Sequence, residues 1–214
     1  DEPNAAEDFM SPKPQRIPPV PASEWTDVMR DLFATFEGPE AREKGSRFKG
    51  IMMLANHPEL AKAWLGYNVF LSKHLSLSQR LVEIVILRIA VRYKSEYEWT
   101  QHTVIAEPLG LGEAHFEALQ QGPGASIWSE PERLCLQVVD ELCEHSSVQD
   151  ATWDALSKHL DKKQVLELLF VAGTYATLAW VFNAARVEPE NMGKEERRAV
   201  IFSPDNVYGQ RSQH

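Results

Sequence analysis

The feature that most constrains the fold is a stretch of 18 residues without a charged side chain, Leu168 to Ala185. This length just reaches the ~18 residues that a membrane-spanning helix requires. However, the stretch is interrupted by four polar residues, Thr174, Tyr175, Thr177 and Asn183, and it is the only one of its kind in the chain. We therefore expect a buried helix inside a folded domain, with no role in a membrane.

Helical patterns also dominate the rest of the chain. Apolar residues recur at helical spacing, and serines that can cap a helix stand at Ser23, at Ser76 or Ser78, and at Ser95. The expected helices span about 23–36, 51–54, 58–74, 81–93, 96–110, 113–120, 129–145, 150–159 and 162–186. Alternation typical of strands and Asn-Gly hairpin turns are not found. The sequence therefore predicts an all-α fold, and 214 residues fit a single domain.

The two ends of the chain differ from this helical part. Residues 1–22 hold six of the thirteen prolines, so they cannot form a helix or a central strand. We expect an arm that is disordered or extended across a neighbour. The helical domain is expected at residues 23–189, followed by a polar C-terminal tail at 190–214.

Charge and cysteine content exclude several classes of protein. The chain has 31 acidic and 22 basic residues, with no cluster of five or more Lys and Arg, which argues against nucleic-acid binding. Its two cysteines, Cys135 and Cys143, lie eight residues apart in an expected helix. That spacing places them roughly 12 Å apart along the axis, too far for a disulfide. A disulfide scaffold and a cysteine-rich zinc module are therefore excluded.

The start of the chain bears on its location. No secretory signal peptide is visible, so we expect a cytoplasmic protein. The first residue is Asp1 and not Met, which indicates processing or trimming and leaves open whether a leader was removed.

Glu83 is the first candidate for chemistry. It lies in the stretch Leu81–Ala90, which is apolar on nearly every face except at Glu83 and Arg88, and a helix of that kind is buried. A buried carboxylate must be paired, hydrogen-bonded or protonated. Such groups cluster at functional sites, but a structural ion pair with Arg80 or another cation would satisfy the same pattern.

Glu98 and His102 are the second candidates. They are four residues apart and share one face of a helix, where a carboxylate can orient the imidazole and raise its basicity for proton transfer. Two alternatives stay open. Ser95 and Glu98 match a capping box at a helix start, and Glu83, Glu98 and His102 together are a conceivable metal site.

This segment resembles the signature of the carboxymuconolactone decarboxylase family, which shares a superfamily with the alkyl hydroperoxidase D proteins. Both have a glutamate (here Glu83), eleven residues, a four-residue motif (here Ser95–Glu98) and then a histidine (here His102). The decarboxylase branch reads Cys-Glu-Tyr-Glu-Trp-x-x-His, and this sequence matches all of it except Ser95. The resemblance covers roughly two thirds of the chain, from about Asn56 to Glu190.

The resemblance implies an alkyl hydroperoxidase D-like helical bundle that assembles into homo-oligomers, commonly trimers or hexamers. It implies a lyase of aromatic catabolism that decarboxylates a carboxylated unsaturated lactone or a related small organic acid without a cofactor or metal. In this interpretation His102 donates the proton, Glu98 orients the His102 imidazole, and Glu83 holds the imidazole or relays a proton.

Five further residues are candidates for binding the substrate: Arg88, Ser95, Trp99, Tyr175 and Asn183. Arg88 would bind a substrate carboxylate if it faces the cavity; alternatively it reaches the surface or pairs with Glu83. Ser95 replaces the family's thiol. The resemblance favours Tyr175 and Asn183 as residues that line the pocket. They fall near one stripe of the expected helix that also carries small residues, and helix packing or a subunit interface would explain this stripe equally. Trp99 would form part of the pocket wall, or it would belong to the hydrophobic core.

The departures from the family weigh against a thiol peroxidase. That branch has Cys-x-x-Cys at positions where this chain has Ser95 and Glu98, which cannot form a sulfenic acid. Cys135 and Cys143 are expected in the core. Two other classes stay open: a peroxidase or oxidoreductase of the same fold that works without thiols, and a non-catalytic oligomer that binds a small ligand.

Overall fold

The computed structural model describes residues 14–208, and these residues form helices and connecting loops without a strand. The N-terminal helices are α1 (Asp27–Glu37), α2 (Ala41–Lys44), α3 (Lys49–Leu54) and α4 (Pro58–Lys73). The middle of the chain forms α5 (Gln79–Tyr93), α6 (Glu96–Ala106), α7 (Glu113–Gln121), α8 (Glu130–His145) and α9 (Asp150–Leu156). The long α10 (Lys162–Ala185) and α11 (Lys194–Ile201) follow, and two short 3₁₀ helices lie at Ala22–Glu24 and Glu107–Leu109. The predicted all-α fold is confirmed.

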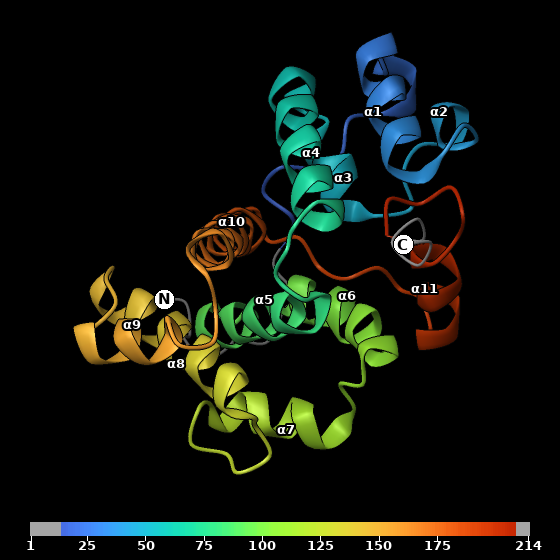
Figure 1. The fold of residues 1–214 in the computed structure, drawn as a ribbon. Helices are drawn as coiled ribbons and strands as arrows, with labels where there is room; N and C mark the ends of the chain where they lie inside the picture. The colour runs from blue at the N-terminus through green and yellow to red at the C-terminus, as the bar shows by residue number, and fades with distance from the viewer. Residues whose placement is uncertain (1–13, 209–214) are drawn as a thin grey trace, which may run out of the picture.

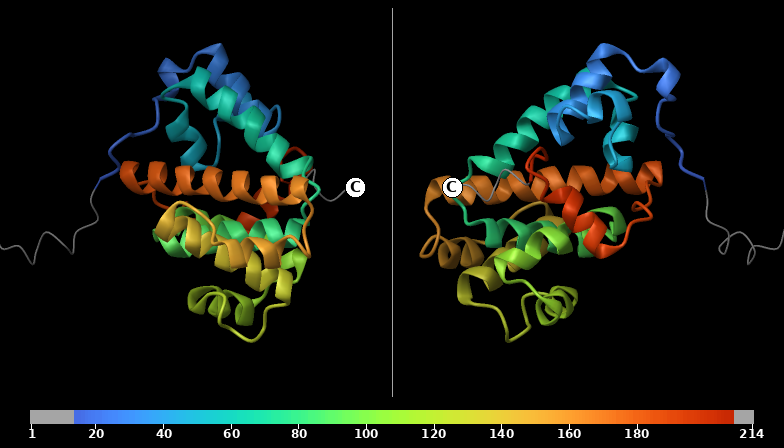
Figure 2. Two further views of the ribbon diagram at one scale, coloured as in Figure 1. Left: turned by 60° about the vertical axis from the view of Figure 1, so that its left-hand side comes forward. Right: turned by 90° about the vertical axis from the view of Figure 1, so that its right-hand side faces the viewer.

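The helix α10 is the central element of the fold. It runs between α1–α4 on one side and α5–α9 on the other (Figures 1 and 2). By length and composition α10 could cross a membrane, but 56% of its most apolar window is buried inside the molecule, as in a core helix. Leu168, Val171 and Ala172 pack in the main core, whereas Phe170 and Trp180 lie at the surface.

The helix α5 is buried because it is apolar on almost all sides. Every residue from Val82 to Ala90 is buried. The side chain of Ser78 caps its N-terminus by accepting a hydrogen bond from the amide of Leu81, and Lys94 ends it in the left-handed conformation. Glu83 is therefore placed inside the molecule by the same pattern that buries the helix.

Three hydrophobic clusters stabilise the molecule. The largest joins α5, α8 and α10, the second joins α1, α3, α4 and α11, and the third lies around α7 between α5, α6 and α8. The helix α6 contributes Tyr97 to the first cluster, Val104 and Ile105 to the second and Ala106 to the third. It therefore lies where the clusters meet.

The N-terminal region differs in detail from the prediction. The first helix starts after Thr26, whose hydroxyl accepts from the amide of Met29, and not at Ser23. Residues 14–22 run over the surface of the same chain, where the amide of Arg16 donates to the carbonyl of Ala185 at 2.8 Å. Residues 1–13 of the expected arm lie outside the described residues.

The segment after residue 190, predicted to be a polar tail, contains a folded helix. α11 buries Arg197, Val200 and Ile201 and packs against α6. The tail looked polar because its apolar residues are few, but they fall on one face of the helix and join the second hydrophobic cluster. This segment therefore helps to enclose the interior described next.

Candidate active site

A small cavity lies where α4, α6, α10 and the C-terminal segment meet. Its interior volume is about 50 Å³. Its polar lining comes mainly from two helices, with Trp64 and Asn68 on α4 and Tyr97, Glu98, Gln101 and His102 on α6. Aromatic and aliphatic side chains from the remaining elements close it, among them Tyr175 on α10 and Tyr208 near the C-terminus.

The imidazole of His102 is held between two carboxylates. Its Nδ1 lies 2.7 Å from Oε2 of Glu83, and its Nε2 lies 3.3 Å from Oε2 of Glu98. All three residues are buried, and Glu83 is fully inaccessible to solvent. Glu98 and His102 line the cavity, whereas Glu83 lies behind the ring. The structure thus brings together the three residues that the sequence singled out.

This environment sets the charge of His102. Burial alone would lower the pKa of the imidazole, but the charge of Glu83 and the hydrogen bonds to Glu83 and Glu98 outweigh it and raise the pKa to about 9. His102 is therefore an imidazolium near neutral pH, and both of its N–H groups are donors. The site holds a proton on a side chain that lines a small cavity.

Glu98 does not cap α6. The Ser95 hydroxyl makes no capping hydrogen bond, and its buried oxygen has no partner. The capping-box interpretation is therefore wrong, and the Glu98 carboxylate instead faces His102 and the cavity. The alternative pairing of Glu83 with Arg80 is also wrong, because Arg80 pairs with Glu132 at 2.7 Å.

Two tyrosines confine the His102 ring. Tyr175 and Tyr208 meet it edge-on, with ring centroids at 5.0 and 6.1 Å. Tyr175 lines the cavity, where the sequence analysis placed it. Tyr208 was missed, because it lies more than one hundred residues from His102 in the sequence and no local pattern connects the two.

The side of the cavity formed by α4 carries polar atoms without partners. The indole Nε1 of Trp64 and the amide Oδ1 of Asn68 are buried and make no hydrogen bond. Sequence analysis missed both residues. Their spacing of four positions in a largely apolar helix is the one signal that places them on a common face.

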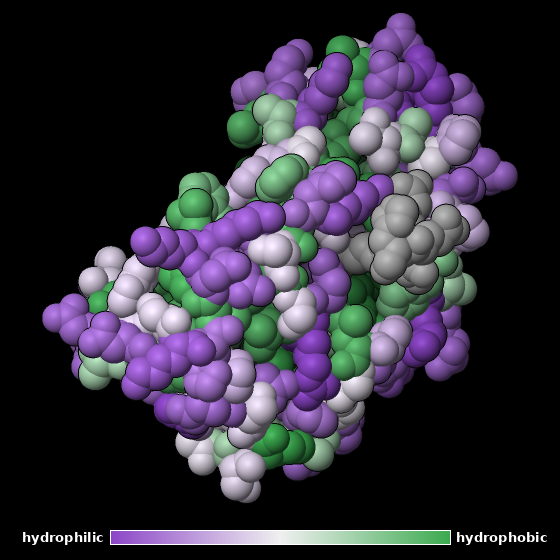
Figure 3. Space-filling model, viewed as in Figure 1, coloured by the Kyte–Doolittle hydropathy of each residue, from purple (hydrophilic) through white to green (hydrophobic). Residues whose placement is uncertain are grey.

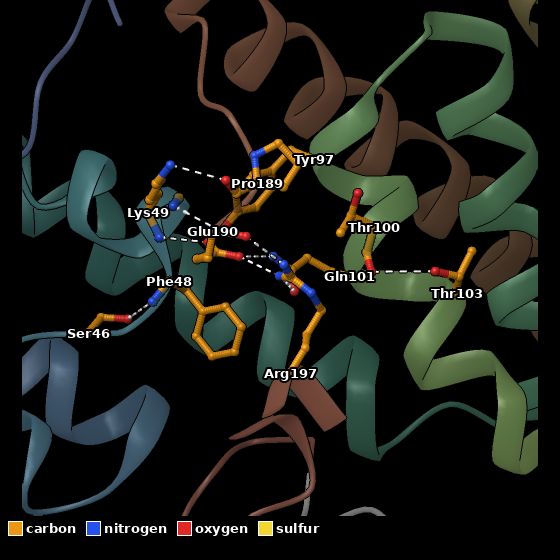
Figure 4. A network of polar contacts seen from close by, with 11 residues as sticks. Ser46, Phe48, Lys49, Tyr97, Thr100, Gln101, Thr103, Pro189, Glu190 and Arg197 are labelled. Atoms are coloured by element: carbon orange, nitrogen blue, oxygen red, sulfur yellow. Dashed lines mark hydrogen bonds and ion pairs between the residues drawn. The ribbon is translucent and has the colours of Figure 1, made fainter. Parts of the chain in front are cut away.

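A buried polar network adjoins the cavity (Figure 4). Glu190 accepts hydrogen bonds from the Tyr97 hydroxyl at 2.8 Å, from Gln101 at 2.6 Å and from Arg197 at 2.6 Å. Tyr97 also accepts from the amide of Gly50 at 3.0 Å, and a Cβ at Gly50 would lie 3.0 Å from that hydroxyl. The network holds α11 and α3 against α6. Sequence analysis did not predict it.

Two of the predicted binding residues face away from the cavity. Arg88 pairs with Asp140 through two hydrogen bonds of 2.8 and 2.7 Å, because it lies five residues after Glu83 and so roughly 140° around α5. Trp99 packs edge-on against Phe116 at 6.0 Å and lines a separate surface cleft. The expectation that they line the site is corrected.

Ser95 and Asn183 are also absent from the described lining of the cavity. Asn183 lies eight residues beyond Tyr175, roughly 12 Å along α10, and its amide donates to the carbonyl of Tyr93 at 2.7 Å. Ser95 is buried at the start of α6, on the turn before Glu98. Neither residue contributes to the polar surface of this cavity.

The cysteines are remote from the site. Cys135 is buried in the core between α5, α8 and α10, and burial raises the pKa of its thiol to about 12. Cys143 is partly buried on α8, and both cysteines are free thiols. The described cavity lining contains no thiol, so sulfenic-acid chemistry has no side chain there.

The two carboxylates do not converge with His102 on a metal position. Glu83 and Glu98 contact opposite nitrogens of the ring, so one ion cannot bind all three groups. Within residues 14–208 no group of three or more His, Cys, Asp and Glu side chains has a geometry that suits a metal. The structure does not support the metal alternative.

Comparison with known proteins shows the fold. No protein-family model and no curated protein matches the chain. An uncharacterized peroxidase-related protein from Ralstonia eutropha JMP134, with an alkylhydroperoxidase AhpD core, superposes with a TM-score of 0.72 at 16% identity, covering 87% of this chain and 98% of that chain. A peroxidase-related protein from Silicibacter sp. TM1040 gives 0.71 at 17% identity, over 88% and 97%.

A third similar structure is that of the debrominase Bmp8 in complex with 2,3,4-tribromopyrrole. Its TM-score is 0.64 at 15% identity, and the match covers 89% of this chain and 98% of that chain. The chain therefore has the alkyl hydroperoxidase D-like fold that its sequence motif implied.

Proposed function

We propose that the chain is a cofactor-independent enzyme that delivers a proton to a carbon atom of a small unsaturated organic acid or lactone. The observation that carries this proposal is the His102 imidazole, held between two carboxylates at the wall of a small, largely apolar cavity. A protonated, oriented side chain in such a site is the equipment of a general acid.

The reaction that the sequence motif favours is decarboxylation of a carboxylated unsaturated lactone. The bond between the ring carbon and the carboxylate breaks, and carbon dioxide leaves. The electron pair spreads into the substrate's own carbonyl as a dienolate, so the step needs no organic cofactor. His102 then gives a proton to carbon, and solvent returns one to the imidazole.

Each charged residue has a distinct role in this proposal. Glu83 fixes the ring through Nδ1, so that the Nε2 side faces Glu98 and the cavity. None of the described lining residues is Lys or Arg, so the imidazolium is the positive charge that a substrate carboxylate meets. The largely apolar lining favours the step in which the localised negative charge of the carboxylate is spread over the dienolate as carbon dioxide leaves.

A peroxidase that works without thiols is the second candidate. Two of the similar structures are described as peroxidase-related, and about 50 Å³ of space suits a molecule as small as hydrogen peroxide. In such an enzyme Glu98 and His102 would transfer protons to and from the peroxide oxygens, and a separate reductant would supply the electrons.

Activity assays separate the two candidates. Purified protein is given a series of carboxylated unsaturated lactones, with release of carbon dioxide as the readout, and in parallel hydrogen peroxide with an added reductant. We expect carbon dioxide release, and a loss of roughly 10²–10⁴ in rate for His102→Gln in a folded variant. The matched control, Cys135→Ser with Cys143→Ser, should retain the rate.

An unchanged rate in folded His102→Gln would exclude His102 as the acid. Peroxide consumption that survives both cysteine changes, is lost in His102→Gln and occurs without carbon dioxide release would favour the peroxidase. Glu98→Gln gives an independent check, since it keeps the shape of the side chain and removes both its negative charge and its proton exchange.

A further inference from the structure

The α4 wall of the cavity presents one donor and one acceptor without partners. Trp64 Nε1 and Asn68 Oδ1 are both buried, and the Asn68 residue is only 2% exposed. The two residues are four positions apart and lie on one face of α4. They line the same cavity as Glu98 and His102, which come from α6.

Such atoms call for an explanation, because buried polar groups in folded proteins are almost always hydrogen-bonded. Five buried side-chain atoms lack a partner among the described residues, and two of the five line this one cavity. On the adjoining wall, Tyr97 and Gln101 both bond to Glu190. The polar atoms of α4 are thus available to a bound molecule.

The chemistry of the two atoms defines what they can bind. An indole N–H is only a donor, and the Oδ1 of an asparagine is only an acceptor. A group that satisfies both must offer a lone pair and a hydrogen side by side. A carboxylate offers only lone pairs, and it would place one of them against the lone pairs of Asn68 Oδ1.

We infer that Trp64 and Asn68 form an anchor for an uncharged part of the substrate that carries both a donor and an acceptor, such as a hydroxyl next to a carbonyl. This inference rests on the proposed function, in which the leaving carboxylate lies at His102. The cavity has about a third of the ~150 Å³ that holds benzene, so the anchored group has only a few non-hydrogen atoms.

Acetamide and acetate test the anchor, because they have the same size and differ in charge and in hydrogen-bond donors. Each is titrated into ¹⁵N-labelled protein, and the Trp64 indole N–H resonance is followed by NMR after assignment with Trp64→Phe. We expect acetamide to shift the Trp64 indole resonance, since it satisfies both atoms. Acetate, which the proposed function places at His102, should leave the Trp64 resonance in place.

Variants identify the atoms responsible. Asn68→Leu keeps the bulk of the side chain and removes the acceptor, so the affinity for acetamide should fall by about tenfold or more. The Trp64 resonance of the ligand-free variant should keep its wild-type position. Trp64→Phe should weaken binding similarly, as followed through the backbone amides of the cavity. Trp128→Phe is the matched control, because it removes a buried indole N–H that bonds to Gly122 elsewhere.

Two results would overturn the anchor: a shift of the Trp64 resonance by acetate as large as that by acetamide, or no shift of this resonance with acetamide. The outcome is separable from the proposed function. His102→Gln abolishes the proposed proton transfer and leaves the anchor in place, so acetamide should still bind to it. Conversely, if acetamide does not bind at Trp64 and Asn68, turnover that depends on His102 still supports the proposed function.

Discussion

At the scale of single residues, the site is defined by an imidazolium between two buried carboxylates. The imidazolium has a carboxylate on each side, and removal of His102 would leave both carboxylates buried without a cation between them. The proton on His102 is thereby coupled to the fold. Its titration can be followed without knowledge of the substrate.

Stability should therefore decrease with rising pH. The pKa of His102 is about 9 in the folded chain and near 6.5 when unfolded, so its contribution is complete below about pH 6.5 and is lost as pH rises through 9. We expect the free energy of unfolding to fall by roughly 3 kcal/mol over this interval. Urea unfolding across the pH range measures it. His102→Gln should lack this fall, while His159→Gln, at an exposed position, should keep it.

The source of the raised pKa can be tested with Glu83. Glu83→Gln removes the carboxylate that contributes most to raising the pKa of His102, so the imidazole should titrate well below 9. NMR of the ring protons reports the titration. Glu132→Gln removes a buried carboxylate that pairs with Arg80 elsewhere, and it should leave the His102 titration unchanged. A pKa still near 9 in Glu83→Gln would contradict this account.

Sequence could predict some site residues and not others for a geometric reason. Glu98 and His102 share a helix face, so their proximity followed from spacing alone, and Glu83 was singled out by the apolar stretch that surrounds it. Arg88 and Trp99 sit next to these residues in sequence but point elsewhere around α5 and α6. Trp64 and Tyr208 come from distant segments, so only tertiary structure brings them to the cavity.

At the scale of elements, α6 links the site to the C-terminal segment. One side of this helix presents Glu98 and His102 to the cavity, and Tyr97 and Gln101 bond to Glu190. Arg197 on α11 completes the network, with only 3% of the residue exposed. The position of α11 is thus fixed by buried ionic contacts.

Breaking this network should be costly. Arg197→Met leaves Glu190 buried without its cation, and we expect a loss of about 3–5 kcal/mol in the free energy of unfolding. The neighbouring Arg198→Met is the matched control, since the Arg198 side chain is 43% exposed and pairs with Glu107. It should cost no more than about 1 kcal/mol. Equal losses for the two variants, measured by urea unfolding, would argue against a special role of the buried pair.

Helix positions were largely predictable because their ends carry local signals. Ser78 before α5, Pro58 at the start of α4 and Asp161 before α10 mark helix starts that the structure shows. The helix α11 was not predicted because it has no side-chain cap and only a narrow apolar face. Its stability comes from tertiary contacts, which a local pattern does not contain.

At the scale of the whole molecule, apolar side chains are exposed along α4 and α10. Leu60 and Phe70 on α4 and Leu166, Phe170 and Trp180 on α10 are each more than half exposed. A groove between these helices is lined by Tyr67, Leu166 and Phe170, among others. Figure 3 shows apolar side chains near α10 among polar ones. Such surfaces commonly mark subunit contacts.

We therefore expect the chain to self-associate through this face, in keeping with the trimers or hexamers that the family resemblance implies. Phe170→Glu places a charge in the groove and should lower the sedimentation coefficient toward that of a monomer. Ile127→Glu changes an exposed apolar residue outside this groove and should sediment as wild type does. A monomeric wild-type protein would contradict the expectation.

The cavity is assembled from both ends of the described chain, since Phe36 and Phe48 line it together with Ile201 and Tyr208. This has a consequence for biosynthesis. A nascent polypeptide emerges with its N-terminal part first, so early helices can form while the last wall is still inside the ribosome. The His102 pocket closes only after Tyr208 has emerged, so any chemistry there begins later than the folding of the N-terminal helices.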